Sequence, residues 1–274
     1  ALRDHVAGIP LLHVDDLTRR DDLERAMLLL SFLGHGYLRE RDDACDQLPA
    51  QLAVPWCKVA RRLGRPAVLS HASVVLRNWR RIDPSGPIAL GNLATIFQFH
   101  GGIDESWFYL VTVEIEAIGA GGVVHLTRAA LAAEQGLDDV VLAGLDGAAG
   151  VMDEMSATLV RVQERCDPYI FYRRVRPFLS SIENVHYQGV TPQLQSHHGG
   201  SAAQSSLFQT YDRVLGVHHD EEPSNGYMRE MLRFMPMAHR NFIEWIGTKS
   251  LRKFCARSEH LRDARHRCLE AVSR

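Results

Sequence analysis

The chain has 274 residues, of which 46% are apolar and 23% charged, and its formal net charge is −2. This composition is that of a globular protein with a substantial core, and it argues against a disordered chain or a general nucleic-acid binder. The five cysteines are scattered and form no CxxC pair, so neither a disulfide framework nor a zinc knuckle is indicated. We predict a soluble cytoplasmic protein with no membrane partner, because the sequence shows neither a secretion signal nor an unbroken apolar run of about 20 residues.

Helical spacing of apolar residues dominates the chain, and strand-like alternation is almost absent, which predicts an all-α protein. The first 65 residues are richer in short segments, so we expect a small helical subdomain at 1–65 and a large helical domain at 66–274. Residues 181–200 lack a regular pattern and are expected to form a functional or mobile loop. The expected helices span residues 21–40, 66–82, 106–134, 136–165, 168–180, 204–217, 223–246 and 248–272.

The segments SHASVVLRNW (70–79) and WFYLVTVEIEAIGA (107–120) both have an inward helical face. His71 shares its face with valines, which is compatible with an ordinary buried polar contact as well as with a role in a site. Phe108 and Thr112 share a face with Tyr109 beside them, and on pattern alone this is an amphipathic core helix.

Two later segments carry candidate binding groups. In IFYRRVRPF (170–178) the arginines indicate a solvated face, although a guanidinium can also hold a carboxylate through two parallel hydrogen bonds. GGSAAQSS (199–206) offers two glycines before a helix start, where free N–H groups can approach an anion, but the motif is common.

In MLRFMPMAHRNFIEW (231–245), His239 stands among methionines and phenylalanines. On one continuous helix it shares a face with Met228, Leu232, Met235, Phe242 and Ile246, and Pro236 is expected to kink or restart that helix. A core histidine bonded to a carbonyl is one interpretation, and an axial ligand to haem iron is the other. The histidine pairs at 197–198 and 218–219 lie in polar sequence without metal-ligand spacing, so a metal-only site is not favoured.

The segments GGSAAQSSLFQTYDRVLGVHH (199–219) and MREMLRFMPMAHRNF (228–242) resemble the two signature segments of the indoleamine 2,3-dioxygenase family of haem proteins. Similar segments precede them in the family's order, at 48–84, 107–120 and 167–180. The resemblance implies an all-helical fold in which a large haem-binding domain is capped on its distal side by a smaller helical domain. It places His239 at the proximal iron ligand.

The resemblance also implies roles for the other candidates. Phe108 and Tyr109 fall on aromatic residues of the indole site, and Phe171 and Tyr172 on aromatic residues at its mouth. Arg176 falls on the arginine that binds the substrate carboxylate. Gly200, Ser201 and Ala202 fall on the segment that borders the haem edge and the substrate.

Two positions depart from the family pattern. Thr112 stands where a serine hydroxyl near bound oxygen is usual, and its extra methyl group narrows the expected site. His71 stands where a tyrosine is common, and an imidazole there could exchange a proton with oxygen or with the indole N–H.

The implied activity is that of a haem b dioxygenase with O2 as co-substrate, which cleaves L-tryptophan or a related indole amino acid to N-formylkynurenine. An electron donor that reduces ferric haem and a monomeric state are expected with it. Three alternatives stay open: a same-fold haem enzyme that hydroxylates or rearranges a tryptophan derivative, a non-catalytic haem- or indole-binding protein, and a helical interaction protein.

Overall fold

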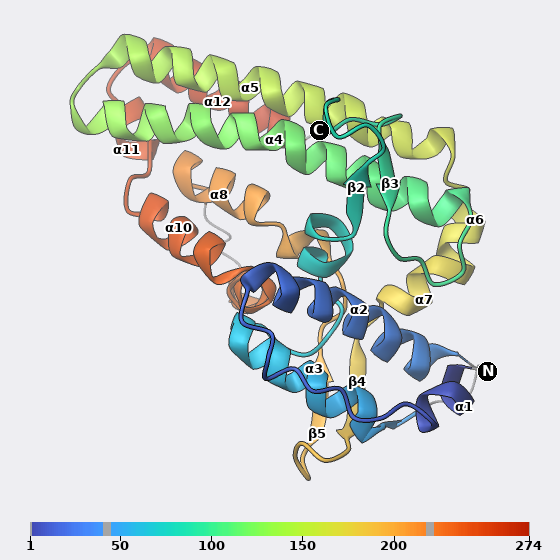
Figure 1. Ribbon diagram of the computed structural model, residues 1–274. Helices are drawn as coiled ribbons and strands as arrows, with labels where there is room; N and C mark the ends of the chain where they lie inside the picture. The colour runs from blue at the N-terminus through green and yellow to red at the C-terminus, as the bar shows by residue number, and fades with distance from the viewer. Residues whose placement is uncertain (1, 41–44, 218–221, 274) are drawn as a thin grey trace.

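The computed structural model describes residues 2–40, 45–217 and 222–273, and the histidine pair at 218–219 lies outside them. Helices make up most of the described chain and strands have two to six residues, which confirms the predicted all-α fold (Figure 1). The α-helices are α1 Leu2–Ala7, α2 Arg20–Arg39, α3 Ala50–Leu63, α4 Ile103–Glu134, α5 Asp138–Val160, α6 Pro168–Ile170, α7 Arg176–Leu179, α8 Ser206–Leu215, α9 Glu222–Met231, α10 Met237–Gly247, α11 Arg252–Cys255 and α12 Glu259–Ser273. The 3-10 and π turns are η1 Ala72–Leu76, η2 Arg161–Glu164, η3 Phe171–Val175, η4 Ala202–Gln204 and η5 Leu232–Phe234.

Helices α4, α5 and α12 form one layer, α8 lies against it, and α10 packs on α8 (Figure 1). Their shared core includes the fully buried Leu126, Leu145 and Tyr211. Helix α8 approaches α4 closely because α4 has Gly122 where the Tyr211 side chain crosses it, and a Cβ atom there would overlap the Tyr211 hydroxyl. This contact fixes the helices that carry the candidate residues.

Helix α4 is also long and apolar enough, in one 18-residue window, to span a bilayer by composition. Half of that window is buried inside the protein, as in the core helix of a folded domain. The composition of α4 is therefore weak evidence for a membrane span.

The N-terminal helices form a second core together with a later strand, in the lower half of Figure 1. Trp56 on α3 stacks on Tyr187 of strand β4 (Ile182–Tyr187) with ring centroids 6.1 Å apart, and the Tyr187 hydroxyl donates to the Ala67 carbonyl. Residues far apart in the sequence thus share this core. The division at residue 65 stays a prediction.

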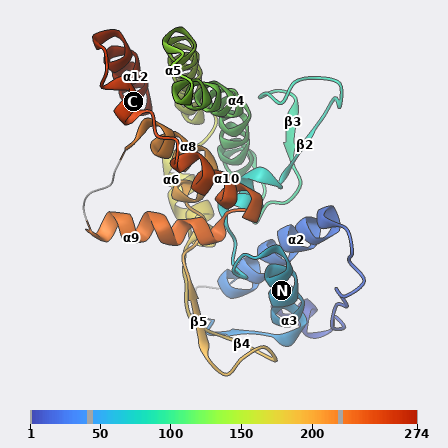
Figure 2. The same ribbon diagram turned by 90° about the vertical axis from the view of Figure 1, so that its left-hand side faces the viewer.

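The 181–200 stretch is not an irregular loop, and this expectation was wrong. β4 pairs antiparallel with β5 (Leu194–His197) and parallel with β1 (Gln47–Leu48), as Figure 2 shows from the side. The strand escapes detection by alternation because its register shifts between Ile182 and Val185, where Asn184 takes a positive φ of 54°. A second pair joins β2 (Trp79–Arg81) and β3 (Leu93–Thr95).

The helix expected at 66–82 is also absent, apart from the π turn η1. Backbone donors there bond to side chains instead of to helical carbonyls: the N–H of Leu69 donates to His35 Nε2, and the N–H of His71 donates to Gln204 Oε1. Residues 67–75 are all buried, so no solvent-exposed face marks a helix in this part of the segment.

The helix expected at 223–246 is two helices. Helix α9 ends at Met231, and α10 restarts after Pro236, which has a ψ of 140°. Proline permits the restart at a helix N-terminus, where its missing N–H has no cost. The six-residue stripe predicted for one continuous helix is therefore divided between two axes.

Candidate functional site

A cavity of about 530 Å³, which we call the aromatic cavity, gathers most of the predicted site residues. It lies between α4, η1, η3 and α7, and the segment that follows β5. Its lining includes the predicted residues His71, Phe108, Thr112, Phe171, Arg176, Gly200, Ser201 and Ala202. The structure therefore brings together groups from five segments of the sequence.

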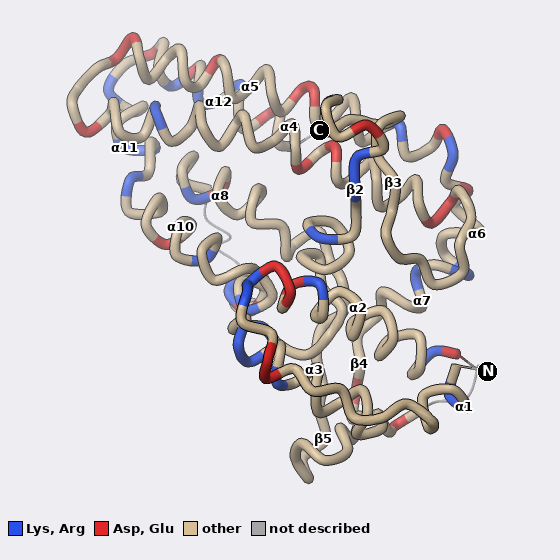
Figure 3. Tube along the Cα trace, viewed as in Figure 1, with Lys and Arg blue, Asp and Glu red and all other residues tan. Residues whose placement is uncertain are grey.

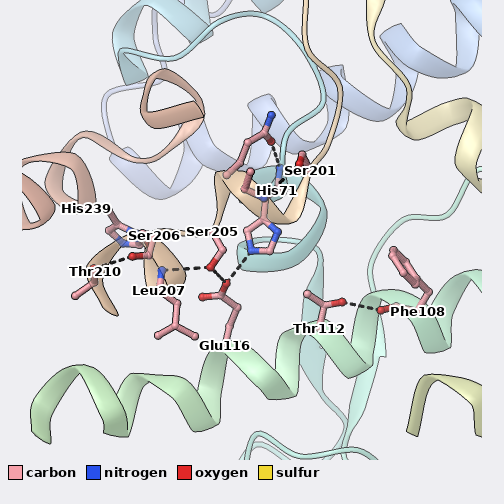
Figure 4. Close-up of polar contacts among 12 residues, drawn as sticks. His71, Phe108, Thr112, Glu116, Ser201, Ser205, Ser206, Leu207, Thr210 and His239 are labelled. Atoms are coloured by element: carbon pink, nitrogen blue, oxygen red, sulfur yellow. Dashed lines mark hydrogen bonds and ion pairs between the residues drawn. The ribbon is translucent and has the colours of Figure 1, made fainter. Parts of the chain in front are cut away.

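The wall of this cavity is aromatic. Phe108 on α4 and Phe171 on η3 have ring centroids 4.3 Å apart, with planes tilted by 39°. Thr112 lies one turn after Phe108, and its hydroxyl donates to the Phe108 carbonyl at 3.0 Å (Figure 4). The Thr112 proton is thus held by its own helix, and a ligand meets an apolar face beside that hydroxyl oxygen.

Arg176 supplies the positive charge at the cavity. It begins α7 with an exposed side chain, and no carboxylate among the described residues pairs with its guanidinium. That guanidinium lies 5.7 Å from the ring centroid of Tyr172. Tyr172 itself is 60% exposed and does not line the cavity, so its contact is with Arg176.

Tyr109 does not reach the cavity, although the sequence predicted an indole contact. Its side chain is fully buried in a separate core cluster, and its hydroxyl donates to Glu105 at 3.1 Å. Burial raises the pKa of the Tyr109 hydroxyl well above its usual range, with the neighbouring Glu105 carboxylate acting in the same direction. The adjacent position on a helix points about 100° away from Phe108, which accounts for this difference.

The segment after β5 presents backbone to the cavity. A Cβ atom on Gly199 would overlap the Leu179 carbonyl, so only glycine fits there, whereas the Cβ direction of Gly200 is open. The Gly199 carbonyl accepts from Gln204 Nε2 at 2.8 Å, and Ser201 Oγ accepts from the N–H of Ala203 at 3.2 Å. The open side of Gly200 leaves room for a ligand against the main chain.

His71 is held by a carboxylate on α4. Its Nε2 lies 2.8 Å from Glu116 Oε1, which also accepts from Ser205 Oγ at 2.5 Å. The other ring nitrogen faces the side of Phe108 and Thr112 (Figure 4). Burial alone raises the pKa of the Glu116 carboxyl, but the hydrogen bonds from His71 and Ser205 and the charge of His71 outweigh it and hold that pKa below its usual value.

His239 lies in a second cavity of about 430 Å³, the His239 cavity, whose wall is largely apolar. Its Nδ1 is 2.7 Å from Ser206 Oγ, and Nε2 has no hydrogen-bond partner in the part of the chain that the structure describes. Burial lowers the pKa of the His239 imidazole, so the ring is neutral at pH 7. Val75 is the residue common to the linings of the two cavities, and the His71–Glu116 pair lies between them.

The arrangement bears on the predicted iron ligand. A neutral imidazole with a free ring nitrogen on an apolar wall is what an axial haem ligand requires. His239 has this form, since Ser206 holds its Nδ1 and its Nε2 lacks a hydrogen-bond partner among the described residues. The residues present therefore fit the group, and the assignment of His239 as the iron ligand stays a prediction.

Sequence reasoning missed Glu116 and Gln204. Glu116 follows Thr112 by four residues on an otherwise apolar helix, which places both on one face, so the signal was present. Gln204 binds the Gly199 carbonyl and the His71 N–H at once. Nothing in the sequence joins it to His71, because 133 positions separate the two residues.

Comparison with known proteins shows the family. A profile described as "Indoleamine 2,3-dioxygenase" matches residues 1–274. Indoleamine 2,3-dioxygenase 2 of Homo sapiens is 35% identical over 99% of this chain and 70% of its own length. The indoleamine 2,3-dioxygenase of Saccharomyces cerevisiae is 33% identical over 99% of this chain and 66% of its own length.

A third relative, the 6-hydroxytryptophan 2,3-dioxygenase of Fusarium equiseti, is 30% identical over 100% of this chain and 70% of its own length. The chain thus spans about two thirds of the length of these relatives. The match over the whole chain and identities above 30% lead to one conclusion: the protein belongs to the indoleamine 2,3-dioxygenase family, whose members are oxidoreductases.

Proposed function

We propose that the protein is a haem-dependent dioxygenase that adds both atoms of O2 across the indole C2–C3 bond of L-tryptophan or a close relative, with N-formylkynurenine as the product. Family membership supports the reaction class. The observation that carries the substrate class is the aromatic cavity, in which Phe108 and Phe171 line the same space as Arg176, and no carboxylate among the described residues pairs with that guanidinium. An indole amino acid has the matching parts, a flat aromatic ring and a carboxylate.

Substrate binding follows from this arrangement. The indole packs against the Phe108 and Phe171 rings, which favour tilted or offset aromatic contacts. The Arg176 guanidinium holds the carboxylate through two parallel hydrogen bonds, with the Tyr172 ring beneath it. The open face of Gly200 accommodates the backbone of the amino acid.

His71 is proposed to handle a proton in this cavity. A Glu116 carboxylate accepting from Nε2–H leaves Nδ1 as the nitrogen that gains or loses a proton. Since that nitrogen faces Phe108 and Thr112, it can exchange a proton with oxygen or with the indole N–H of a substrate that packs there. Glu116 and Ser205 then act as positioning residues, because they touch His71 or one another and not the substrate.

Haem is proposed to supply the activation of O2. The aromatic cavity provides groups for the oxygen and substrate side of such a site. His239 would hold the iron through its free Nε2, and the largely apolar wall of the adjoining His239 cavity would cover the macrocycle.

A ring-substituted tryptophan is a second candidate substrate. One relative carries the name 6-hydroxytryptophan 2,3-dioxygenase, and the buried His71–Glu116 pair offers a hydrogen-bonding group inside the cavity that a substituted indole can use. The proposal keeps a reductant for ferric haem, a monomeric state, a cytoplasmic location and the division at residue 65 as accompanying expectations.

Titration of the haem-loaded protein with L-tryptophan and with tryptamine tests the substrate assignment. We expect Arg176→Ala to weaken L-tryptophan binding by about 10- to 100-fold, because a hydrogen-bonded charge pair contributes roughly 1.5–3 kcal/mol. Tryptamine lacks the carboxylate, so its affinity should stay the same. Arg173→Ala is the matched control, since Arg173 also lies over Tyr172 but does not line the cavity. Equal losses for both ligands, or for both variants, would contradict the assignment.

A further inference from the structure

A third cavity, of about 410 Å³, lies on the other side of the β5 strand end from the aromatic cavity and shares no lining residue with it. We call it the basic cavity. Four arginines and one histidine line it, and no acidic side chain does. These residues are Arg61, Arg65, Arg233, Arg240 and His197.

Separate segments supply these cations. Arg61 lies in the last turn of α3 and Arg65 two residues after that helix ends, while His197 ends β5. Arg233 belongs to η5 and Arg240 to α10. Figure 3 shows basic segments both at the end of α3 and at the start of α10, and a hydrogen bond from Arg240 Nη2 to the Gly64 carbonyl at 2.9 Å joins the two. The fold thus concentrates positive charge from distant parts of the sequence in one hollow.

Hydrogen bonds and ion pairs inside the protein satisfy only some of the donors of these arginine side chains. Arg65 has a side chain 2% exposed and bonds to Glu24 through Nη2, but its Nε and Nη1 atoms are buried without a hydrogen-bond partner. The exposed side chains of Arg61 and Arg233 have no ion pair among the described residues. A buried donor without a partner is costly, and clustered guanidinium groups repel one another.

The nearest acidic groups do not neutralise the cavity. Glu24 contacts Arg65 but is not part of the cavity lining, and Glu230 bonds to the neighbouring His198. Burial lowers the pKa of the His197 imidazole, and the charge of Arg233 lowers it further, although the Glu230 carboxylate opposes part of this shift. The hollow is therefore electropositive in the absence of a ligand.

We infer that the basic cavity binds a small multivalent oxyanion, a phosphate ester or a polycarboxylate, through the Arg61, Arg233 and Arg240 guanidinium groups. A guanidinium group can donate two parallel hydrogen bonds to a pair of oxygen atoms on a phosphate or a carboxylate. These charge-assisted hydrogen bonds are stronger than hydrogen bonds between neutral groups. The volume is within the range of small-molecule sites and larger than one inorganic phosphate needs. This site does not depend on the dioxygenase proposal, because the two cavities share no residue.

Isothermal titration calorimetry with pyrophosphate and with citrate, each against a KCl control of equal ionic strength, tests the inference. We expect saturable binding to the wild-type protein. The double variant Arg61→Gln/Arg233→Gln should weaken it at least about tenfold, since each lost guanidinium contact removes a charge-assisted bond. Arg229→Gln, which changes an exposed arginine of α9 outside the cavity, should bind within about twofold of wild type.

The anion that binds identifies its source: pyrophosphate alone indicates a phosphate ester, and citrate alone a polycarboxylate. Thermal melts without anion check the fold, and the double variant should melt at or above the wild-type temperature because two repelling charges are gone. If it melts lower, the single variants Arg61→Gln and Arg233→Gln replace it. No saturable heat with either anion, an effect reproduced by KCl, or equal binding by the cavity variants and Arg229→Gln would overturn the inference.

Discussion

At the scale of single residues, Glu116 has the most consequence for the site. Its carboxylate lines the His239 cavity and bonds across to His71, which lines the aromatic cavity. The pair thus lies where the two adjoining cavities, which share Val75, approach one another. A single acidic residue on an apolar helix holds His71 in the lining of the aromatic cavity.

The free ring nitrogen of His239 gives a prediction for haem binding. Because Nε2 has no hydrogen-bond partner among the described residues and His239 lines a largely apolar cavity, we expect His239→Ala to lose haem absorbance. Ser206→Ala, which removes only the hydrogen bond to Nδ1, is the matched control and should keep haem. Unchanged haem absorbance in His239→Ala, or an equal loss in both variants, would contradict the assignment of His239.

The placement of single residues was predictable where the motif itself contained the geometry. Phe108 and Thr112 are four positions apart on one helix, so their common face follows from the helical period. The stripe of six residues through His239 shows the limit, because it assumed one continuous helix and Pro236 divides that helix in two. Tyr109 shows another, since a motif of two adjacent aromatic residues does not tell which one faces the ligand.

At the scale of elements, the contact between α4 and α8 positions the site. Gly122→Ala should lower the free energy of unfolding by about 1–3 kcal/mol, because the new methyl group overlaps the buried Tyr211 hydroxyl. Gly150→Ala in α5 meets nothing within 4 Å and should be neutral or stabilising by up to about 1 kcal/mol. Urea unfolding of both variants measures the difference, and equal stability of the two would contradict the packing described.

The long helices were predictable and the short elements were not. The apolar residues of α4 and α5 recur with helical spacing over many turns, so a few residues that break the pattern do not hide it. Within 66–82, residues 67–75 are all buried and bond part of their backbone to side chains of distant residues, so this stretch has no periodic face. Strand pairing at β1 and β4 depends on contacts across more than 100 positions, and no local pattern contains them.

At the scale of the whole molecule, His35 joins separate parts of the chain. It is fully buried on α2, its Nδ1 donates to the Phe178 carbonyl at 2.8 Å, and its Nε2 accepts from the Leu69 N–H at 3.1 Å. Burial lowers the pKa of His35 from 6.5 to about 4, although the Phe178 hydrogen bond opposes the shift. The neutral ring is therefore part of the folded state.

This pKa gives a prediction for acid stability. Between pH 6.5 and 4 the unfolded chain binds a proton at His35 that the folded chain does not, so stability falls as the pH falls, by up to about 3 kcal/mol. The loss ends below pH 4, where both states are protonated. Denaturant unfolding across this window gives the free energy of unfolding as a function of pH. Its slope against pH should be shallower for His35→Gln than for wild type, and unchanged for the exposed control His260→Gln. Equal slopes in all three proteins would remove His35 as the cause.

The central claim is that this protein inserts both oxygen atoms into an indole amino acid. Mass spectrometry of the product formed from L-tryptophan by the reduced, haem-loaded protein under isotopically labelled O2 tests it most directly. We predict two labelled oxygen atoms and the fragmentation pattern of N-formylkynurenine. A product with one labelled oxygen atom or with a rearranged skeleton would contradict the claim, as would no product from either L-tryptophan or 6-hydroxytryptophan.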